Sequence, residues 1–386
     1  DNKLIVFASR IFLGLVFIFS GYVKVVDPLG SEYKFVDYFE AFGTDFMVPL
    51  ALPLAMIMSA VEFVLGVALF FNVLPRLSAW GVTLFFFFFT PLTLYLALAN
   101  PVSDCGCFGD ALILTNLQTF WKNIFIDIFV VILFVNRKKL TSHLHSLVQW
   151  ILMLIFFGAT ILFQVFTVQH LPIVDFRPYR INANIPEKMK IPEGAPQPKY
   201  ETTLYYEKDG VTKKFTMENL PDSTWKWVRT ENELIDAGYV PPIHDFSIVT
   251  VRDNEYKGYP ANTDITTEVL ENPDYSFLMV AYDISEADVE GLMFGNELAQ
   301  FCEQKGLHLY CLTASSSEEI KQVKQKHGFT FNCYTTDEIT LKTIVRASPG
   351  FVLLKNGTII NKWHHNDMPS ILDIQEKYLK NKPVTE

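Results

Sequence analysis

The chain has 386 residues, half of them apolar, and a formal net charge of −10. Because phosphate backbones are bound through clustered lysine and arginine side chains, this acidic balance argues against a nucleic-acid partner. The average conceals two unlike parts, since long apolar runs fill the sequence up to about residue 168 and ordinary globular composition follows. At roughly 100–200 residues per domain, two units are expected.

Five stretches of the first part are apolar enough to be membrane-spanning helices, each of which needs about 20 such residues. They cover residues 4–26, 49–72, 77–99, 120–135 and 147–168, and the fourth could start at Leu117. The first stretch has no small-residue cleavage site and is followed directly by Asp27, so we expect it to be retained. Residues 1–168 are therefore predicted to form an all-α bundle of about five spans in membrane lipid.

Basic residues predict the orientation of this bundle. They occur before or within the first span, between spans two and three, and after span four: Lys3, Arg10, Arg76, Arg137, Lys138 and Lys139. The loops of the opposite side, 27–48 and 100–119, are acidic. Because basic loops stay in the cytoplasm, we expect a bacterial inner-membrane protein whose C-terminal part lies in the periplasm, where disulfides can form.

Among the ionisable residues inside the predicted spans, Lys24, Glu62 and Asp127 are candidates for a special role. Such groups are costly at membrane depth and usually face the bundle interior or a partner. Lys24 lies near a span end and could extend to the interface, whereas Glu62 could pair with Lys24, be protonated, or carry protons. A structural Lys24–Glu62 pair and a chemical role are equally open from the sequence.

The external loop "NPVSDCGCFGDALILTN" holds Cys105 and Cys107 with only Gly106 between them. A Cys-x-Cys bridge closes a small ring, and strained, exposed disulfides tend to be labile. Free thiols or a structural bridge are the alternatives, and without a nearby histidine to complete a zinc set no metal is expected. Asp104 and Asp110 flank the pair and are expected to disfavour thiolates. Redox activity is the favoured interpretation.

The pieces "FIFSGYVKVVDP", "VEFVLGVAL" and "DCGCFGD" resemble the DoxX/MauE family of small four-helix membrane proteins over roughly residues 5–136. The resemblance implies thiol or sulfur redox chemistry, with a quinone as a candidate cofactor for DoxX-type proteins and maturation of a disulfide-rich periplasmic enzyme for MauE. The architecture is also similar to that of quinone-linked disulfide oxidoreductases, which use Cys-x-x-Cys where this chain has Cys-x-Cys.

Residues 169–199 contain six prolines and no apolar period, which predicts an extended, semi-rigid linker. From Tyr200, polar and apolar residues alternate around Asp209-Gly210, which predicts a β-hairpin. The C-terminal unit, residues 200–386, is thus expected to begin with a hairpin extension.

A strand and helix rhythm begins near residue 240 and ends in a hairpin and a helix, which resembles the α/β thioredoxin-like fold. Pro349 then corresponds to the cis-proline of that fold. The family's Cys-x-x-Cys should lie near Ile284–Asp288, where this chain reads "DISEAD", so the domain lacks the dithiol. Three further cysteines are expected to be small buried residues: Cys302, Cys311 and Cys333.

Two functions compete. In the first, Cys105 and Cys107 exchange electrons with a periplasmic thiol partner and the bundle passes them to a quinone. In the second, the protein is a non-enzymatic assembly or accessory factor, whose degenerate thioredoxin-like domain binds an envelope protein. Transport is disfavoured because the sequence shows neither an internal repeat nor paired broken helices.

Overall fold

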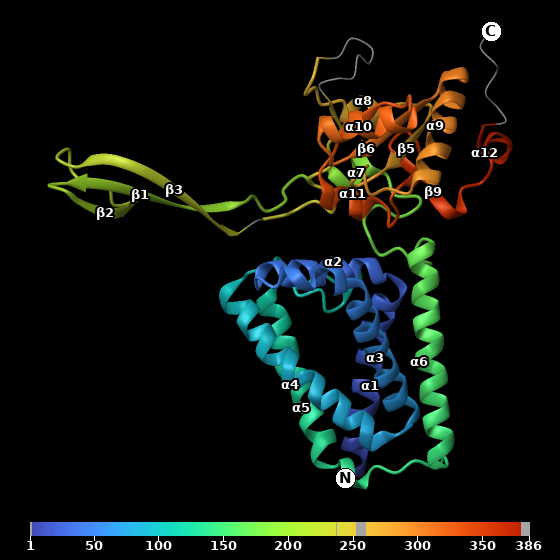
Figure 1. Cartoon of the computed structure of the whole chain (residues 1–386). Helices are drawn as coiled ribbons and strands as arrows, with labels where there is room; N and C mark the ends of the chain where they lie inside the picture. Colours follow the sequence, from blue (N-terminus) through green and yellow to red (C-terminus); the bar gives the residue numbers. More distant parts are fainter. Residues whose placement is uncertain (1, 237, 252–259, 380–386) are drawn as a thin grey trace.

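The computed structural model describes residues 2–236, 238–251 and 260–379. It consists of a helical membrane part and a C-terminal α/β part, which meet at the end of helix α6 (Figure 1). Both units of the sequence prediction are therefore present.

Within the described residues, five helices are long and apolar enough to cross a membrane. They are α1 (Asn2–Val26), α3 (Ala51–Phe71), α4 (Pro75–Ala99), α5 (Asn116–Val135) and α6 (Ser146–Gln169). These are the five predicted spans, so the prediction of a helical membrane part is confirmed. Large apolar side chains such as Leu98, Leu162 and Phe87 are exposed on them and would face lipid.

Helices α1 and α3 approach each other closely because glycines line their contact. A Cβ at Gly21 would lie 2.6 Å from the Phe63 backbone, and one at Gly66 would lie 2.5 Å from Ile18 N. Small residues let membrane helices pack backbone against backbone. This close contact brings the polar residues of the two helices within hydrogen-bond reach.

Residues 27–48 are predicted to be a loop, but they contain a helix, α2 (Pro28–Ala41), which lies across one end of the bundle (Figure 1). The Asp27 carboxylate caps it by accepting from Gly30 N, and Pro28 occupies the first turn. A short 3-10 helix, η1 (Asp45–Leu50), then leads into α3. Figure 1 shows α2 between the bundle and the α/β part.

The predicted basic sites lie together at the other end of the bundle. Arg10 donates to Leu69 O, and Arg76 donates to Lys138 O. The N-terminus is at this same end, away from the α/β part (Figure 1). The basic end and the α/β part thus occupy opposite ends of the spans.

The α/β part is built on a six-stranded mixed sheet in the order β4-β7-β6-β5-β8-β9. Strands β5, β6 and β7 are parallel, whereas β4, β8 and β9 run antiparallel to their neighbours. The strands are β4 (Val249–Thr250), β5 (Tyr275–Val280), β6 (His308–Thr313), β7 (Cys333–Thr335), β8 (Gly350–Lys355) and β9 (Thr358–His364).

Side chains on the two faces of this sheet form two cores, because alternate strand residues point to opposite faces. Leu278 and Val280 enter one core, Phe277 and Met279 the other. The first core is covered by α7 (Ile185–Met189), α8 (Thr266–Leu270) and α11 (Glu338–Ile344). The second is covered by α9 (Val289–Gln304), α10 (Ser317–His327) and α12 (Ile371–Tyr378).

The structure corrects the prediction that residues 169–199 form a linker. Tyr179 and Ile185 are buried in the first core, and Ile185 N donates to Gly357 O at the turn between β8 and β9. The segment lacks an apolar period because, apart from the short helix α7, it is irregular and buries only scattered residues. The α/β domain therefore starts well before residue 200.

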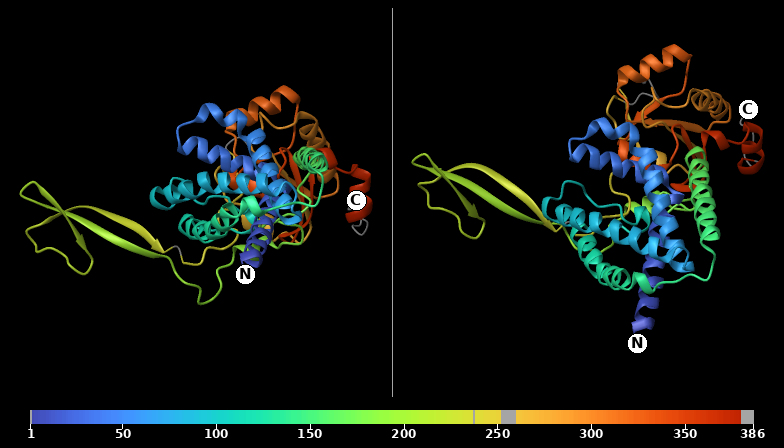
Figure 2. Two further views of the ribbon diagram at one scale, coloured as in Figure 1. Left: turned by 90° about the horizontal axis from the view of Figure 1, so that it is seen from below. Right: turned by 60° about the horizontal axis from the view of Figure 1, so that its bottom comes forward.

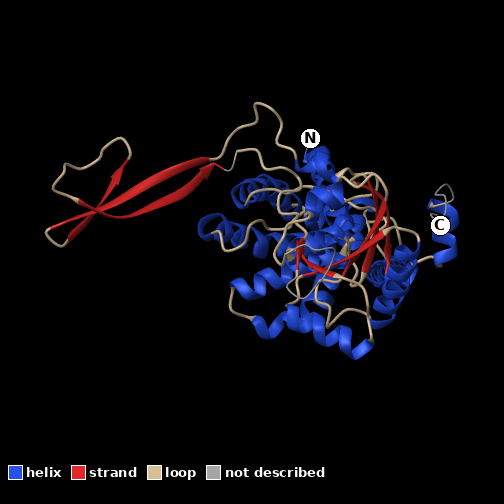
Figure 3. Ribbon diagram, turned by 90° about the horizontal axis from the view of Figure 1, so that it is seen from above, coloured by secondary structure: helices blue, strands red, loops and turns tan. Residues whose placement is uncertain are grey.

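Strands β1 (Lys199–Lys208), β2 (Val211–Thr216) and β3 (Lys226–Asp236) form a separate antiparallel sheet in the order β2-β1-β3. Asp209 and Gly210 make the predicted hairpin turn with positive φ. The sheet projects from the body as an arm in every view (Figures 1, 2 and 3). Because the preceding residues belong to the domain, the arm is an insertion rather than an N-terminal extension.

A cluster of buried charged side chains connects the chain just after α6 to strand β9. Asp175 lies 2.8 Å from Arg177 Nε and 2.5 Å from Lys362 Nζ. Burial alone would raise the pKa of the Asp175 carboxyl, but Arg177 and Lys362 outweigh it and hold the pKa at about 2. One carboxylate thus compensates two buried cations.

Replacing that carboxylate should destabilise the protein. Asp175→Asn leaves Arg177 and Lys362 buried without an anion, which should cost roughly 3–5 kcal/mol and lower the melting temperature of the purified chain. A carboxyl whose pKa is lowered by folding stabilises the protein fully above its unfolded pKa and loses this contribution as pH falls to its folded pKa. The stability of the parent should therefore decrease as pH falls from about 4 to about 2, whereas Asp175→Asn has no such contribution to lose. Glu376→Gln, at an exposed position, is the control. Equal melting temperatures for parent and Asp175→Asn would contradict the assignment.

Candidate functional site

The loop between α4 and α5 carries a disulfide between Cys105 and Cys107. Asn116, the first residue of α5, donates from Nδ2 to Asn100 Oδ1 and to Val102 O and holds the ends of the loop together. Within the loop, Gly106 N donates to Asp104 Oδ1 at 2.8 Å. The bridge is thus part of a structured loop.

Helix α2 fixes this loop from the side. Lys34 Nζ lies 2.8 Å from Asp104 Oδ2, and the Tyr38 hydroxyl donates to Cys105 O at 3.0 Å. Gly106 has a φ of +63°, and a Cβ there would lie 2.9 Å from the Lys34 side chain. Only glycine fits this position without strain.

A polar network between α1 and α3 lies beneath the loop. Lys24 Nζ is 2.8 Å from Glu62 Oε2 and 3.0 Å from Ser20 Oγ. Ser20 Oγ in turn lies 2.6 Å from Glu62 Oε1 and 2.6 Å from Cys107 O. All three residues are buried: Lys24 is 9% exposed, Glu62 3% and Ser20 5%. The structure thus brings Lys24 and Glu62 together and ties both to the cysteine loop.

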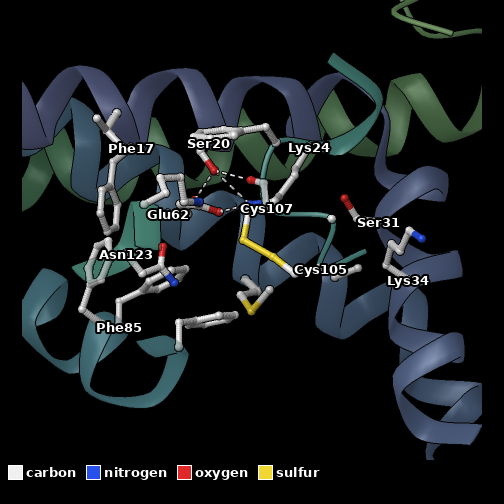
Figure 4. A pocket seen from close by; sticks show the side chains of 18 of the residues that line it. Phe17, Ser20, Lys24, Ser31, Lys34, Glu62, Phe85, Cys105, Cys107 and Asn123 are labelled. Carbon is white, nitrogen blue, oxygen red and sulfur yellow. Dashed lines mark hydrogen bonds and ion pairs between the residues drawn. A yellow bond between two sulfur atoms is a disulfide. The ribbon is translucent and has the colours of Figure 1, made fainter. Parts of the chain in front are cut away.

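The disulfide and this network line one cavity of about 70 Å³ (Figure 4). Its other wall is apolar and aromatic, with Phe17, Phe85 and Phe89 among the lining residues. Lys122 and Asn123 of α5 add polar groups, and the Lys122 ammonium lies 4.4 Å from the centre of the Phe108 ring. The arrangement is an apolar chamber with a few polar groups beside a disulfide, which is the composition of many small-molecule sites.

A second cavity, of about 90 Å³, shares Gly106 with the first and is more polar. Lys24 and Lys34 line both cavities. Asp110 and Arg177 line only the second. The cysteine loop therefore borders both an apolar chamber in the bundle and a more polar one that Arg177 also lines.

Arg346 connects the α/β domain to the same loop. Its guanidinium lies 3.0 Å from Asp27 Oδ2 and 2.9 Å from Asp110 Oδ2, and the residue is 4% exposed. Burial would lower the Arg346 pKa, but Asp27 and Asp110 outweigh it and raise the pKa. The domain is thus docked on the bundle through a buried cation.

This pairing corrects one expectation. Asp104 and Asp110 were expected to repel thiolates, but each carboxylate is bound to a cation, Lys34 or Arg346. Their effect on the cysteines is therefore largely neutralised. The sequence makes Asp127 a candidate together with Lys24 and Glu62. Its carboxylate accepts a hydrogen bond from Thr90 Oγ1 at 2.9 Å, and the residue lines neither cavity.

The segment Ile284–Asp288 lies beside Pro349, because Asp288 N donates to Ser348 O at 3.0 Å. The Ser348-Pro349 bond is cis. Gly291, in the first turn of α9, packs on the Pro349 ring. The sequence places no cysteine at this end of the sheet.

The remaining cysteines, Cys302, Cys311 and Cys333, are buried, as expected, and none of them is in a disulfide. Burial raises the pKa of the Cys302 thiol to about 12, which suppresses its reactivity. Cys311 and Cys333 are register partners on β6 and β7 but form no bridge. Among the described residues, no group of three His, Cys, Asp or Glu side chains could hold a metal ion.

Comparison with known proteins bears on the part that holds this site. The family model described as "Methylamine utilisation protein MauE" matches residues 2–137. This stretch holds the first four spans and is the part of the chain that is similar to MauE, called the MauE-like part below. A second model, described as "Domain of unknown function (DUF8463)", matches residues 200–237, which are the arm. No curated protein and no solved structure matches the chain.

Several site residues of the MauE-like part were not identified from the sequence: Ser20, Lys34, Tyr38 and Lys122. Ser20 precedes Lys24 by one helical turn, a spacing that places both on one face, and this was the available signal. Lys34 is the only lysine or arginine between Asp27 and Val48. Tyr38 lies one turn after Lys34, so its position depends on the unpredicted helix α2.

The Lys24–Glu62 pair predicts how Glu62 variants behave. Glu62→Leu leaves a buried ammonium without its anion, at a cost of roughly 3–5 kcal/mol, whereas Glu62→Gln keeps hydrogen-bonding groups for Lys24 and Ser20. We therefore expect Glu62→Leu to lower the yield of monodisperse protein and Glu62→Gln to lower it much less. Removing both charges, in Lys24→Leu with Glu62→Leu, should recover part of the yield.

Glu40, exposed on α2, supplies the control variant Glu40→Leu, which should give the parental yield. Equal yields of Glu62→Leu and Glu62→Gln would show that the pair does not support the fold.

Proposed function

We propose that this chain is a membrane thiol–disulfide redox protein in which Cys105 and Cys107 cycle between disulfide and dithiol. The observation that carries the proposal is the position of the bridge, which lines a chamber inside the bundle beside a buried Lys24–Glu62 pair. A purely structural bridge needs neither the chamber nor a buried charge pair next to it.

The reaction has two half-cycles. In the first, the two thiols of a partner protein become a disulfide while the Cys105–Cys107 bridge takes up two electrons and two protons. In the second, a quinone from the bilayer accepts the two electrons and two protons from the dithiol, which reforms the bridge and yields quinol. The net transfer is from the partner's thiols to the quinone.

The chamber offers what a quinone headgroup requires. Aromatic side chains, including Phe85 and Phe89, supply an apolar wall. The amide of Asn123 and the ammonium of Lys122 are hydrogen-bond donors of the kind that carbonyl oxygens accept. Both come from α5, whose opposite face would be in contact with lipid.

We further propose that the α/β domain is a thioredoxin-like scaffold without its dithiol. The order β6-β5-β8-β9 supports this, with α9 between β5 and β6 and α12 after β9. The segment Ile284–Asp288 and Pro349 lie at the end of the sheet that holds the dithiol in that fold, and they have no cysteine. The role of the domain would be to recruit and orient the thiol partner.

The alternative is a membrane accessory factor without redox activity, which binds an envelope protein through the domain. The missing dithiol favours it, and so does the similarity of the first four spans to a family of methylamine utilisation proteins. The two candidates differ in whether Cys105 and Cys107 are needed for function.

Serine variants decide between them. Cys105→Ser and Cys107→Ser should each abolish redox function to the same degree, and alkylation of intact cells followed by mass spectrometry should find both dithiol and disulfide forms of the parent. Cys302→Ala removes a thiol outside the site and is the control. If both serine variants behave like the parent in every cellular assay, the accessory factor is the better account.

We also propose that the α/β domain lies on the periplasmic side of a bacterial inner membrane. The support is the clustering of basic residues at the opposite end of the spans, together with the rule that such loops stay in the cytoplasm.

A reporter that is active only outside the cytoplasm, fused after Glu386, should therefore be active. The same reporter placed in the loop after span four, near Lys139, should be silent. Activity at Lys139 together with silence after Glu386 would reverse the orientation and remove the redox proposal.

A further inference from the structure

The three-stranded arm has two faces of different chemistry. Alternate residues of a strand point to opposite sides of a sheet, and the strand register places Leu204 opposite Phe215 and Tyr206 opposite Trp227 on one side. We call this side the aromatic face. It carries Tyr206, Val211, Phe215 and Trp227 together with the lysines Lys208 and Lys213. None of its described residues is acidic.

The rings of the aromatic face contact one another. The Phe215 ring lies 5.7 Å from that of Tyr206 and 5.2 Å from that of Trp225, which follows in the loop before β3. The Lys213 ammonium lies 5.6 Å from the centre of the Trp225 ring. The face is nevertheless open, because Trp227 is 59% exposed and Val211 is 54% exposed. Contiguous exposed apolar surface of this kind indicates a binding partner.

The opposite face of the arm is covered by its own charged side chains. Tyr205 is buried there beneath the Lys214 ammonium and the Arg229 guanidinium, which lie 5.5 Å and 4.3 Å from the centre of its ring. The Tyr205 hydroxyl donates to Glu231 at 2.6 Å. This face therefore needs no partner, and the aromatic face is the one that does.

The arm extends over the region that lipid occupies around the bundle. It leaves the body between α2 and the α/β part and runs across the direction of the spans (Figure 1). Seen from below, it lies outside the outline of the membrane helices (Figure 2, left). In a membrane, the surface next to the arm is therefore phospholipid.

We propose that the aromatic face of the arm binds the anionic phospholipid surface beside the bundle. Tryptophan and tyrosine favour the headgroup level, where one end of the ring system is apolar and the other is wet. Lysines near a membrane surface are attracted by anionic headgroups, and the face has no carboxylate that they would repel. The proposal does not depend on the redox activity of the cysteine loop.

The same charges disfavour a second copy of the chain as the occupant. If two aromatic faces packed against each other, Lys208 and Lys213 of one copy would meet the same lysines of the other. Like charges placed together across an interface are unfavourable. An anionic lipid surface supplies the opposite charge over the whole face.

The test places a fluorescent label on either face of the purified full chain in nanodiscs that contain phosphatidylglycerol. Val211→Cys provides the labelling site on the aromatic face, and Thr212→Cys provides one at the next position, on the opposite face; both residues are exposed. The native cysteines do not compete, because three are buried and two are bridged. Brominated phospholipids should quench the label at position 211, and acrylamide should quench the label at position 212.

Two further variants add a carboxylate to each face in turn. Trp227→Glu changes an exposed residue of the aromatic face, and Thr216→Glu changes an exposed residue of the opposite face. Trp227→Glu should abolish the quenching of label 211 by brominated lipid, whereas Thr216→Glu should leave it unchanged. Nanodiscs of phosphatidylcholine alone should weaken this quenching, because the two lysines then lose their anionic partners.

Three results would overturn the proposal. If acrylamide quenches both labels equally, the aromatic face is free in water and suits a soluble partner. If label 211 is shielded only when a nanodisc holds two copies of the chain, the second copy covers the face. If brominated lipid quenches both labels equally, the binding does not belong to the aromatic face.

Discussion

The contact between Lys24 and Glu62 organises the outer end of the bundle. Neither charge could be buried alone, since an unpaired ion at such a site is strongly destabilising. Their 2.8 Å approach depends on the glycines that let α1 and α3 touch backbone to backbone. Ser20 extends the pair to Cys107 O, so the position of the cysteine loop depends on the same helix contact. Helix packing, charge compensation and placement of the disulfide are therefore one coupled arrangement.

Arg346 connects the membrane part to the α/β domain through buried ion pairs. It binds Asp27, the cap of α2, and Asp110, which ends the cysteine motif. Through these two carboxylates the α/β domain contacts both elements that frame the disulfide. The end of the sheet that carries Pro349 is thereby held over the bundle, and Tyr282 at this end donates to Val345 O, one residue before Arg346.

The sequence was sufficient for the membrane spans and for the alternation of strands and helices in the second unit, because both follow from the periodicity of apolar residues. It was not sufficient for α2, whose mixed composition resembles that of a loop. Ser20 and Lys34 were missed because their roles depend on which helix faces which, a property of packing. The interpretation of residues 169–199 as a linker failed at Tyr179 and Ile185, since two anchoring residues in a proline-rich segment produce no pattern.

The way in which the arm is attached makes it structurally independent of the domain that carries it. Lys199, the first residue of β1, pairs with Asp236, the last residue of β3, so the arm enters and leaves the domain at one place. Tyr239 N donates to Pro196 O and closes the base. A unit attached in this way can be gained, lost or exchanged without disturbing either core, because the chain on both sides is already held together. A separate family model matches residues 200–237, which begin and end close to the first and last strands of the arm. The arm is thus a structural unit of its own, and its strands can change without altering the packing of the domain that carries it.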